Sequence, residues 1–322
     1  MVLSADQVEI GQAGPDSRRM KAPLIIYHTS FLPYLPFSLF QNTRTNPNRE
    51  TILLGDRHNR VSGIPYTHIE TEGYQEKNRE FLPVYRHASP SHFGDERRCI
   101  ERWFVLWDFL EKNKTKSFYF MDSDYLLFAN LDDFEKNWAH GSVCGTPRIF
   151  GLGYFPDAEL IGCLCRWILG LYKNGARFEA TREQFRRAGS GLQEMGLIAE
   201  FCREEKVSVM DLSWRQVGTD PCFDDGFFGS SYRYTPKEFH RLRQSQAGGP
   251  VFARDGKKIQ RLLGLHFGGH NKSQIPGFTG WSTAVLRSFL RPNYRRNLKW
   301  LIQYALTGSA CRRQLQSKAF LA

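Results

Sequence analysis

A run of four apolar residues that ends in two aspartates constrains the fold of this chain more than any other stretch. Phe118-Tyr119-Phe120-Met121 leads directly into Asp122-Ser123-Asp124. A short run that is apolar throughout predicts a strand buried on both faces, as in a parallel sheet. A strongly patterned helix is predicted just before it, over residues 101–112. In open α/β sheets ligands bind at the carboxyl ends of strands, so the aspartates mark a candidate site.

The two aspartates indicate a metal ion. The carboxylates of Asp122 and Asp124 repel each other unless a cation or several hydrogen-bond donors lie between them. Oxygen ligands of this kind suit Mg²⁺ or Mn²⁺, and such an ion commonly links protein carboxylates to the phosphates of a nucleotide. The other interpretation is that Asp-Ser-Asp forms an ordinary turn. The buried strand in front of the triplet favours the metal site.

The remainder of the chain alternates between strand and helix patterns. Residues 24–28, 51–55 and 67–69 are predicted strands, and a helix over 37–42 is predicted to end by residue 48. Residues 74–98 are charged and are expected to be irregular. This order predicts an α/β protein with a mixed, mainly parallel sheet flanked by helices. Further strands are predicted at 142–145, 207–212 and 262–267, and further helices at 160–171, 181–187 and 195–204.

Composition is that of an ordinary globular protein, with 41% hydrophobic and 24% charged residues among 322. The length suits one large domain, placed at residues 22–280 after a flexible polar leader at 1–21. The leader lacks the apolar core of a signal peptide, and no apolar run is long enough to predict a transmembrane helix. The seven cysteines are odd in number and fit no zinc pattern, which indicates reduced thiols in a cytoplasmic protein.

Positive charge is concentrated at the carboxyl end of the chain. The formal net charge is +11, and residues 273–322 contain eight Lys and Arg residues but no Asp or Glu. Residues 281–322 are therefore predicted to form a basic tail, with one or two amphipathic helices over 284–307 that divide at Pro292. Such helices bind anionic membrane surfaces, so the protein is expected to be peripheral to the inner face of a membrane. The alternative is a terminal helix that packs on the core and exposes a cationic face.

A second candidate site follows the last predicted strand, where residues 265–272 read Leu-His-Phe-Gly-Gly-His-Asn-Lys. The imidazole of His266 could complete the coordination of a divalent ion. The glycines permit close backbone approach to an oxyanion, and Lys272 could neutralise charge on a diphosphate leaving group. The alternative is a turn with an incidental surface lysine. The presence of Asp122 and Asp124 in the same chain disfavours that alternative.

Three parts of the chain, spanning roughly residues 22 to 275, resemble the nucleotide-sugar glycosyltransferases of the GT-A type. Residues 266–272 fit an H-x-x-G-x-x-K pattern through His266, Gly269 and Lys272, similar to that of the retaining glycogenin and lipopolysaccharide galactosyltransferase group. In that group Pro-Trp follows the lysine, whereas Ser273-Gln274 follows it here, so either stereochemical outcome stays open. The other matching parts are Ile25-Ile26-Tyr27-His28, Leu35-Pro36-Phe37-Ser38-Leu39, Asn46-Pro47-Asn48 and Leu53-Leu54-Gly55-Asp56, similar to the opening of many bacterial enzymes of this type, and Arg102-Trp103-Phe104-Val105-Leu106 with Phe120-Met121-Asp122-Ser123-Asp124, similar to their helix and D-x-D strand.

The resemblance implies a Rossmann-like GT-A fold and a role for each matching residue. Asp122, Asp124 and His266 would hold Mn²⁺ or Mg²⁺, and Lys272 would contact the diphosphate and assist its departure. A base that deprotonates the acceptor is expected at Glu194 or Asp225, with Asp224 a weaker candidate. The other contacts to the nucleotide-sugar donor are expected from His28, Thr29, Ser30, Asp56, Arg102, Ser123 and Gly269.

The function implied is transfer of a sugar from a nucleoside-diphosphate sugar, expected to be a UDP-sugar, to a glycan or lipid-linked acceptor, as in polysaccharide biosynthesis. Two alternatives are weighed against it. A metal-dependent nucleotidyltransferase would also use paired carboxylates, but residues 29–36 lack the glycines of its usual phosphate loop. A basic nucleic-acid-binding protein is suggested by the pI near 9.4. The charge, however, lies in the tail and no nucleic-acid-binding motif occurs, so no nucleic-acid partner is expected.

Overall fold

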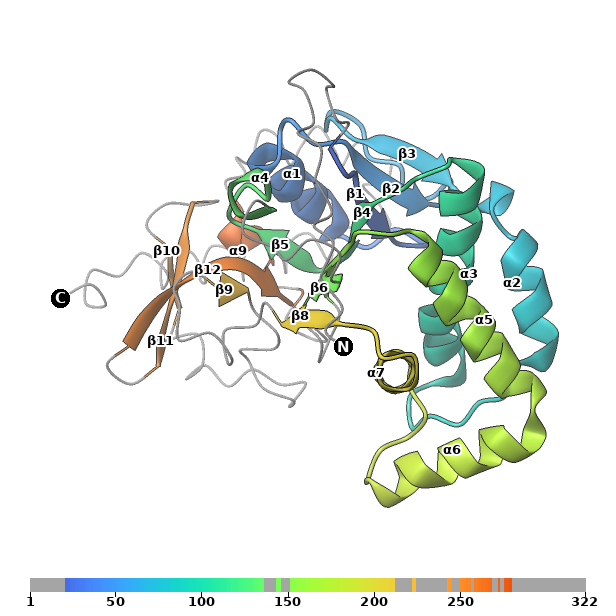
Figure 1. Ribbon diagram of the computed structural model, residues 1–322. Coiled ribbons are helices and arrows are strands. Elements are labelled where there is room, and N and C mark those ends of the chain that lie inside the picture. The colour runs from blue at the N-terminus through green and yellow to red at the C-terminus, as the bar shows by residue number, and fades with distance from the viewer. Residues whose placement is uncertain are drawn as a thin grey trace, which may run out of the picture.

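The computed structural model describes residues 21–135, 143–145, 151–211, 222–223, 242–244, 249–255, 258–267, 272 and 275–279, and the structural statements below concern these residues. Their strands form two sheets, and helices pack around them (Figure 1). The larger sheet has the order β3 (Thr67–Glu70), β2 (Thr51–Gly55), β1 (Leu24–Tyr27), β4 (Phe118–Asp122), β7 (Leu152–Phe155), β6 (Val143–Gly145), β8 (Val209–Asp211). The smaller has the order β10 (Leu242–Gln244), β11 (Val251–Asp255), β12 (Lys258–His266), β5 (Tyr125–Leu127), with β9 (Cys222–Phe223) beside β12.

The larger sheet is mixed but mainly parallel. β1 pairs in parallel with β2 and with β4, and β2 with β3, whereas β7 runs antiparallel to both of its neighbours. Tyr27 is the register partner of Asp122, so the carboxyl ends of β1 and β4 meet at one edge. The predicted α/β fold, with a mixed sheet flanked by helices, is confirmed. The predicted tail at 281–322 lies outside the described residues, and the proposed domain boundaries stay predictions.

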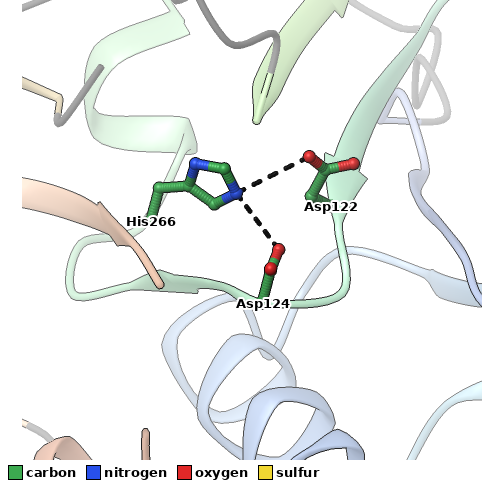
Figure 2. A group of neighbouring side chains, drawn as sticks. All are labelled: Asp122, Asp124 and His266. Carbon is green, nitrogen blue, oxygen red and sulfur yellow. Dashed lines mark hydrogen bonds and ion pairs between the residues drawn. The ribbon is translucent and has the colours of Figure 1, made fainter. Parts of the chain in front are cut away.

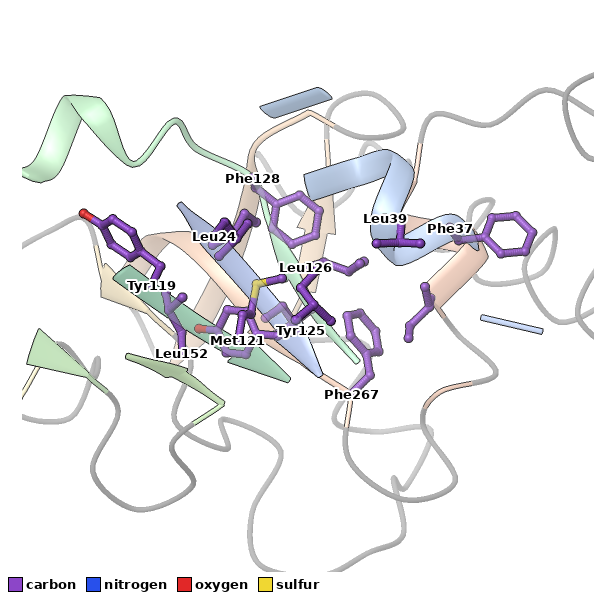
Figure 3. Packing of buried hydrophobic residues seen from close by; sticks show 14 of the residues in the cluster. Leu24, Phe37, Leu39, Tyr119, Met121, Tyr125, Leu126, Phe128, Leu152 and Phe267 are labelled. Carbon is purple, nitrogen blue, oxygen red and sulfur yellow. The ribbon is translucent and has the colours of Figure 1, made fainter. Parts of the chain in front are cut away.

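Side chains of the central strands alternate between two hydrophobic layers, because successive residues of a strand point to opposite faces. Ile25, Phe118 and Phe120 pack against α3 (Phe93–Lys112), α5 (Glu159–Lys173) and α7 (Glu194–Glu204). Leu24 and Met121 pack on the other face against α1 (Leu35–Thr45) and the smaller sheet (Figure 3). Burial of each large apolar side chain stabilises the fold by about 1.5–3 kcal/mol. The remaining helices are α2 (Glu76–Phe81), α4 (Asp132–Glu135), α6 (Gly175–Arg187) and α9 (Ile275–Phe278), with 3₁₀ turns at Thr71–Gly73 and Leu82–Val84.

The chain passes from one sheet to the other at Ser123-Asp124. β4 ends at Asp122 in the larger sheet, and β5 begins at Tyr125 in the smaller sheet. β5 pairs antiparallel with β12, and His266 is the register partner of Tyr125. The candidate residues of the aspartate triplet and of the second motif therefore meet where the two sheets join.

Polar side chains of α1 fix the position of β5 by satisfying its backbone. The amide of Asn42 donates to the Tyr125 carbonyl oxygen over 3.0 Å, and its oxygen accepts from the Leu127 N–H over 2.8 Å. Gln41 donates to the Leu127 carbonyl oxygen over 2.9 Å. Buried polar groups are tolerated when they are paired in this way. These bonds hold the short strand in register without a second strand beside it among the described residues.

Several predicted elements differ from those observed. Residues 74–98, expected to be irregular, contain α2 and the first turns of α3, so that expectation was wrong. The N-terminal turns of α3 expose charged residues such as Asp95 and Arg98, which weakened their apolar pattern. β5 and β7 were not predicted as strands. Residues 268–271, which contain the two glycines of the second motif, lie outside the described residues.

Membrane and redox expectations are only partly addressed by the described residues. No helix among them is both long and apolar enough to cross a bilayer. The described cysteines are free thiols, with Cys144 and Cys165 buried and Cys163 exposed. Two of these five thiols are therefore buried, and the reduced state expected from the sequence stays a prediction.

Gly264 is expected to be intolerant of a side chain. A Cβ atom at Gly264 would lie 2.4 Å from Cε1 of Tyr125, a ring that is completely buried and that stacks with His266. Gly264→Ala should therefore destabilise the protein by about 1–3 kcal/mol, the usual cost of overpacking. Urea denaturation measures this change. Gly170→Ala is the matched control, because a Cβ there meets nothing within 4 Å and alanine favours the helix. Equal effects of the two substitutions would contradict the packing argument.

Candidate functional site

Three side chains predicted as metal ligands converge where the sheets join. One ligand atom from each of Asp122, Asp124 and His266 lies within 4.8 Å of the others. Nε2 of His266 lies 3.1 Å from Oδ1 of Asp124 and 3.7 Å from Oδ2 of Asp122 (Figure 2). The side chains come from the end of β4, the start of β5 and the end of β12. The fold thus brings together residues separated by more than 140 positions in the sequence.

The orientation of His266 is set by the strand pairing and by ring stacking. The imidazole stacks on the Tyr125 ring, with centroids 5.8 Å apart and an interplanar angle of 24°. Because β5 and β12 are paired at these two residues, the ring lies over its register partner. Nε2 consequently faces both carboxylates, as Figure 2 shows.

Arg102 of α3 links Asp122 to Glu194. Its guanidinium donates to Oδ1 of Asp122 over 2.6 Å and to Oε1 of Glu194 over 2.7 Å. Trp103 Nε1 donates to the same oxygen of Glu194 over 2.5 Å. Burial alone would lower the pKa of Arg102, but the two carboxylates raise it well above its ordinary value. Arg102 therefore stays charged and holds one oxygen of Asp122 in place.

Lys272 compensates the second carboxylate. Its Nζ lies 2.9 Å from Oδ2 of Asp124. Burial alone would raise the pKa of Asp124, but Lys272 and His266 together lower it well below its usual range. Asp124 in turn raises the pKa of Lys272 well above its ordinary value. The pair is ionised at neutral pH, and its Asp124 member is 6% exposed.

The donor set fits a hard or borderline divalent ion. Two carboxylates and one imidazole nitrogen supply the oxygen and nitrogen ligands that Mn²⁺ accepts. Arg102 occupies Oδ1 of Asp122, whereas Oδ2 faces His266. Asp124 points Oδ1 toward the same imidazole. The carboxylates are therefore pre-oriented toward a common point, and protein cations balance their charge.

Glu194 lies at the start of α7 inside this network. It is 7% exposed, and its N–H donates to Oε1 of Glu96 over 2.6 Å. Burial raises the pKa of Glu194 to about 7, against the opposing effect of Arg102. The segment before Glu194 packs against residues 88–90. The backbone N–H of Leu192 donates to the Ala88 carbonyl oxygen, and the chain passes so close to Pro90 that a Cβ at Gly191 would lie 2.2 Å from its ring. The carboxylate predicted as an acceptor-side base is thus enclosed by protein.

The raised pKa of Glu194 predicts a pH dependence of stability. Between its ordinary pKa of 4.5 and about 7, the folded protein holds a proton that the unfolded chain releases. The contribution of Glu194 to stability therefore decreases as pH rises through that window. Glu194→Gln should remove this dependence. The free energy of unfolding of the wild type relative to the variant should fall by roughly 2–3 kcal/mol between pH 4.5 and 7.

Urea denaturation at several pH values measures this difference. Glu205→Gln, at an exposed position that follows the same helix, serves as the control and should track the wild type. A pH-independent difference between wild type and Glu194→Gln would contradict a raised pKa at Glu194.

The predicted nucleoside pocket is a hydrogen-bonded cluster at the ends of β1 and β2. Asp56 accepts from the backbone N–H of Ser30 and, over 2.8 Å, from that of His58. Ser30 has a φ of 67°, an uncommon value for a residue with a side chain. Asn59 donates to the His28 carbonyl oxygen, and its own oxygen accepts from the Asp56 N–H over 3.0 Å. Asp56 thus orders the loop after β1, where its expected contact with a base or ribose stays a prediction.

The remaining predicted residues divide into two groups. Nδ1 of His28 lies 2.9 Å from Oγ of Ser123, which places both beside the carboxylates, and Thr29 follows on the same loop. Gly269, Asp224 and Asp225 lie outside the described residues, and their roles stay predictions.

Two residues of the site had no sequence-based assignment. Tyr34 approaches Ser123 with 3.1 Å between their hydroxyl oxygens, and Trp103 binds Glu194. An aromatic side chain in an apolar pattern is ordinarily core, so neither gave a signal. The position of Trp103 directly after Arg102 is the one hint that the sequence offered.

Comparisons with known proteins give a consistent but weak result. No family model matches the chain, and no curated protein matches it. Similar solved structures include mouse xyloside xylosyltransferase 1 in its apo form, at 10% identity and a TM-score of 0.41, covering 61% of this chain and 90% of that one. Galactosyltransferase LgtC, in complex with donor and acceptor sugar analogs, has 11% identity and a TM-score of 0.40. The match covers 83% of this chain and 96% of that one. The apo WbbM bifunctional glycosyltransferase has 11% identity and a TM-score of 0.38, and this chain spans 40% of it.

All three of these structures are of glycosyltransferases. At identities near 10% and TM-scores below 0.5 they carry no argument of their own. The conclusions drawn for this chain therefore rest on its sheet topology and on the convergence of Asp122, Asp124 and His266.

Proposed function

We propose that this chain is a metal-dependent glycosyltransferase, which moves a sugar from a nucleoside-diphosphate sugar to a glycan or lipid-linked acceptor. The observation that carries the proposal is the convergence of Asp122, Asp124 and His266 at the carboxyl end of β4, which is parallel to β1, with Lys272 beside them. That edge of an open α/β sheet is where ligands bind. The motif resemblance implies the donor class, and UDP-sugars are the first donors to test.

Asp122, Asp124 and His266 would hold Mn²⁺ or Mg²⁺. When bound, such an ion supplies positive charge that stabilises a departing diphosphate. The positive charge of Lys272 would stabilise the same departing diphosphate. Its ammonium is paired with Asp124, and once another cation compensates Asp124 the ammonium can donate to phosphate oxygens.

Arg102 and Glu194 would act by positioning. Arg102 holds Oδ1 of Asp122 in place. Glu194 accepts hydrogen bonds from both Arg102 and Trp103, and so holds the guanidinium of Arg102 in position. We assign Glu194 to this role rather than to deprotonation of the acceptor, because its side chain is only 9% exposed and already accepts two hydrogen bonds. Asp225 keeps the role of candidate base as a prediction. The predicted basic tail would bring the enzyme to anionic membranes that carry lipid-linked acceptors.

Thermal unfolding in the presence of ligands tests the proposal. UDP or GDP together with Mn²⁺ should raise the unfolding midpoint, whereas the nucleotide without Mn²⁺ should raise it far less. A ligand at 100 times its dissociation constant stabilises a protein by about 2.7 kcal/mol, which is easily detected. A panel of UDP- and GDP-sugars, scored by released nucleotide, then identifies the donor.

Two outcomes would overturn the proposal. Stabilisation by oligonucleotides without metal, and none by Mn²⁺ with a nucleotide, would favour a nucleic-acid-binding protein. Release of pyrophosphate from a nucleoside triphosphate and a sugar phosphate, without transfer from nucleotide sugars, would favour a nucleotidyltransferase.

A further inference from the structure

Phe93, the first residue of α3, has the most exposed large hydrophobic side chain among the described residues. It is 49% exposed. It follows the loop that connects the 3₁₀ turn at Leu82–Val84 to α3. A single exposed apolar side chain needs no explanation, whereas a cluster of exposed rings indicates a binding surface. The neighbours of Phe93 decide between these two cases.

Two further rings and one guanidinium surround the Phe93 ring. The ring centroids of Tyr85 and His87 each lie 5.6 Å from that of Phe93, at interplanar angles of 66° and 62°. The guanidinium carbon of Arg97 lies 5.5 Å from the centre of the Phe93 ring. The hydroxyl oxygen of Tyr85 and Nδ1 of His87 are 3.1 Å apart, so polar atoms border the rings. These four residues, Tyr85, His87, Phe93 and Arg97, are called the Phe93 surface below.

Buried side chains support this surface from the protein side. Tyr85 stacks on Tyr172 of α5, with ring centroids 5.9 Å apart and an interplanar angle of 17°. It also contacts Phe81 of α2 edge-on, with 5.7 Å between the centroids, and both of these partners are buried. In the loop before α3, Ser89 donates to the buried carboxylate of Glu96 over 3.3 Å. Rings held in this way lose little conformational freedom on binding, so the surface is preformed for a ligand.

The Phe93 surface belongs to the elements that enclose the candidate site. The residue after His87 is Ala88, and its carbonyl oxygen accepts from the N–H of Leu192 over 3.0 Å, two residues before α7 begins. α3 begins at Phe93 and carries Arg102 of the carboxylate network nine residues later. Because a helix rises 1.5 Å per residue, these two positions are separated by roughly 14 Å along the helix axis. A single ligand that reaches both must be a chain of several units.

The charges beside the exposed rings are largely balanced. Arg97 pairs with Glu101 over 2.8 Å, and Arg98 pairs with Asp95. Arg86, in the loop before α3, places its guanidinium over a ring of α6. Surfaces that bind anionic membranes or nucleic acids carry clusters of cations that are free to meet phosphates. The pairing therefore favours a neutral ligand, one with apolar faces for the rings and polar edges for the imidazole, phenol and guanidinium.

Sugars in pyranose form have this combination of faces and edges. Their ring C–H groups carry partial positive charge and pack on the negative face of an aromatic ring, and their hydroxyls both donate and accept hydrogen bonds. We propose that the Phe93 surface binds a neutral glycan chain, as an outer subsite for the acceptor, several sugar units from the one that receives the transferred sugar. The role in transfer rests on the proposed function, whereas glycan binding can be measured by itself.

Binding of the full-length protein to an array of neutral and anionic mono- to hexasaccharides tests the surface without any donor. The wild type should bind neutral oligosaccharides, and Phe93→Ala should weaken that binding about tenfold or more. Alanine favours the helix at this position, and circular dichroism checks the fold. Phe93→Trp, which keeps an aromatic ring, should stay within about threefold of the wild type. Phe93→Leu, which keeps apolar volume without a ring, should resemble Phe93→Ala.

Leu82→Ala is the matched control, because Leu82 is 40% exposed and contributes apolar surface without a ring. It should bind the same oligosaccharides as the wild type does. Three results would overturn the inference: no glycan binding by the wild type, equal binding by Phe93→Ala, or Phe93-dependent binding to vesicles of anionic phospholipid in place of glycans. The last result would assign the surface to a membrane.

Kinetics separate failure of this inference from failure of the proposed function. With an oligosaccharide acceptor, the effect of Phe93→Ala should be about a tenfold rise in KM rather than a loss of kcat, since the contact is remote from the reacting atoms. If the wild type turns over no nucleotide sugar yet binds glycans through Phe93, the proposed function fails and the glycan surface stands. If sugar transfer occurs and Phe93→Ala binds and transfers as the wild type does, the glycan surface alone is wrong.

Discussion

Asp124→Asn is expected to abolish Mn²⁺-dependent binding of nucleotide and any sugar transfer that depends on it. Asparagine keeps the shape of the side chain but removes the charge that faces His266 and Lys272. Replacement of residues that merely support a metal site typically costs 10- to 100-fold in affinity, so loss of a ligand should cost at least about 100-fold. Electron paramagnetic resonance of free Mn²⁺ measures binding independently of turnover.

Asp133→Asn is the matched control for this prediction. Asp133 is exposed near the start of α4, and the same substitution there should leave Mn²⁺ binding as in the wild type. Circular dichroism checks that both variants are folded. Mn²⁺ affinity within twofold of the wild type in folded Asp124→Asn would remove Asp124 from the metal site.

Arg102→Met is expected to destabilise the protein by about 3–5 kcal/mol. The substitution preserves much of the aliphatic volume but leaves Asp122 and Glu194 buried without their shared cation. Breaking a buried ion pair by removing one partner has a cost of that size, because the remaining charge is uncompensated. Mn²⁺ affinity should fall as well, since Oδ1 of Asp122 is no longer held. Urea denaturation measures the first effect and calorimetry the second.

Two further variants make the interpretation specific. Arg182→Met breaks an ion pair with Glu179 in which both side chains are about half exposed, and it should change stability by no more than about 0.5 kcal/mol. In the double variant Arg102→Met/Glu194→Gln, the hydrogen bond between the two side chains is lost only once, so the destabilisation should be less than the sum of the two single effects. Strict additivity would show that Arg102 and Glu194 do not interact.

The parts of the fold that the sequence predicts well are those with an unbroken local pattern. β2 at Thr51–Gly55 and β4 at Phe118–Asp122 are apolar throughout, because helices or strands cover both faces. The candidate ligands followed from position alone, since Asp122 and Asp124 come directly after one apolar strand and His266 ends another. Periodicity and turn chemistry are local properties, and a single sequence carries them in full.

What the sequence could not provide depends on contacts between distant residues. Glu194 was predicted as a base that deprotonates the acceptor, yet α3 encloses it through Arg102 and Trp103. β5 is only three residues long, and its register depends on Asn42 of α1 and on β12. The hydrogen bonds of Ser123 with Tyr34 and His28 join segments that are about 90 positions apart, and no pattern within either segment encodes them.

The placement of His266 in the smaller sheet has a consequence for folding. His266 and Asp124 are separated by 142 positions in the sequence, so the ligand set depends on a long-range contact, a kind that forms slowly during folding. A divalent ion that binds residues of both sheets would favour their association, because it stabilises only the state in which the two sheets are packed together. Amide hydrogens of β12 should consequently exchange more slowly with Mn²⁺ present, while those of β2, which lie entirely within the larger sheet, should report global unfolding alone.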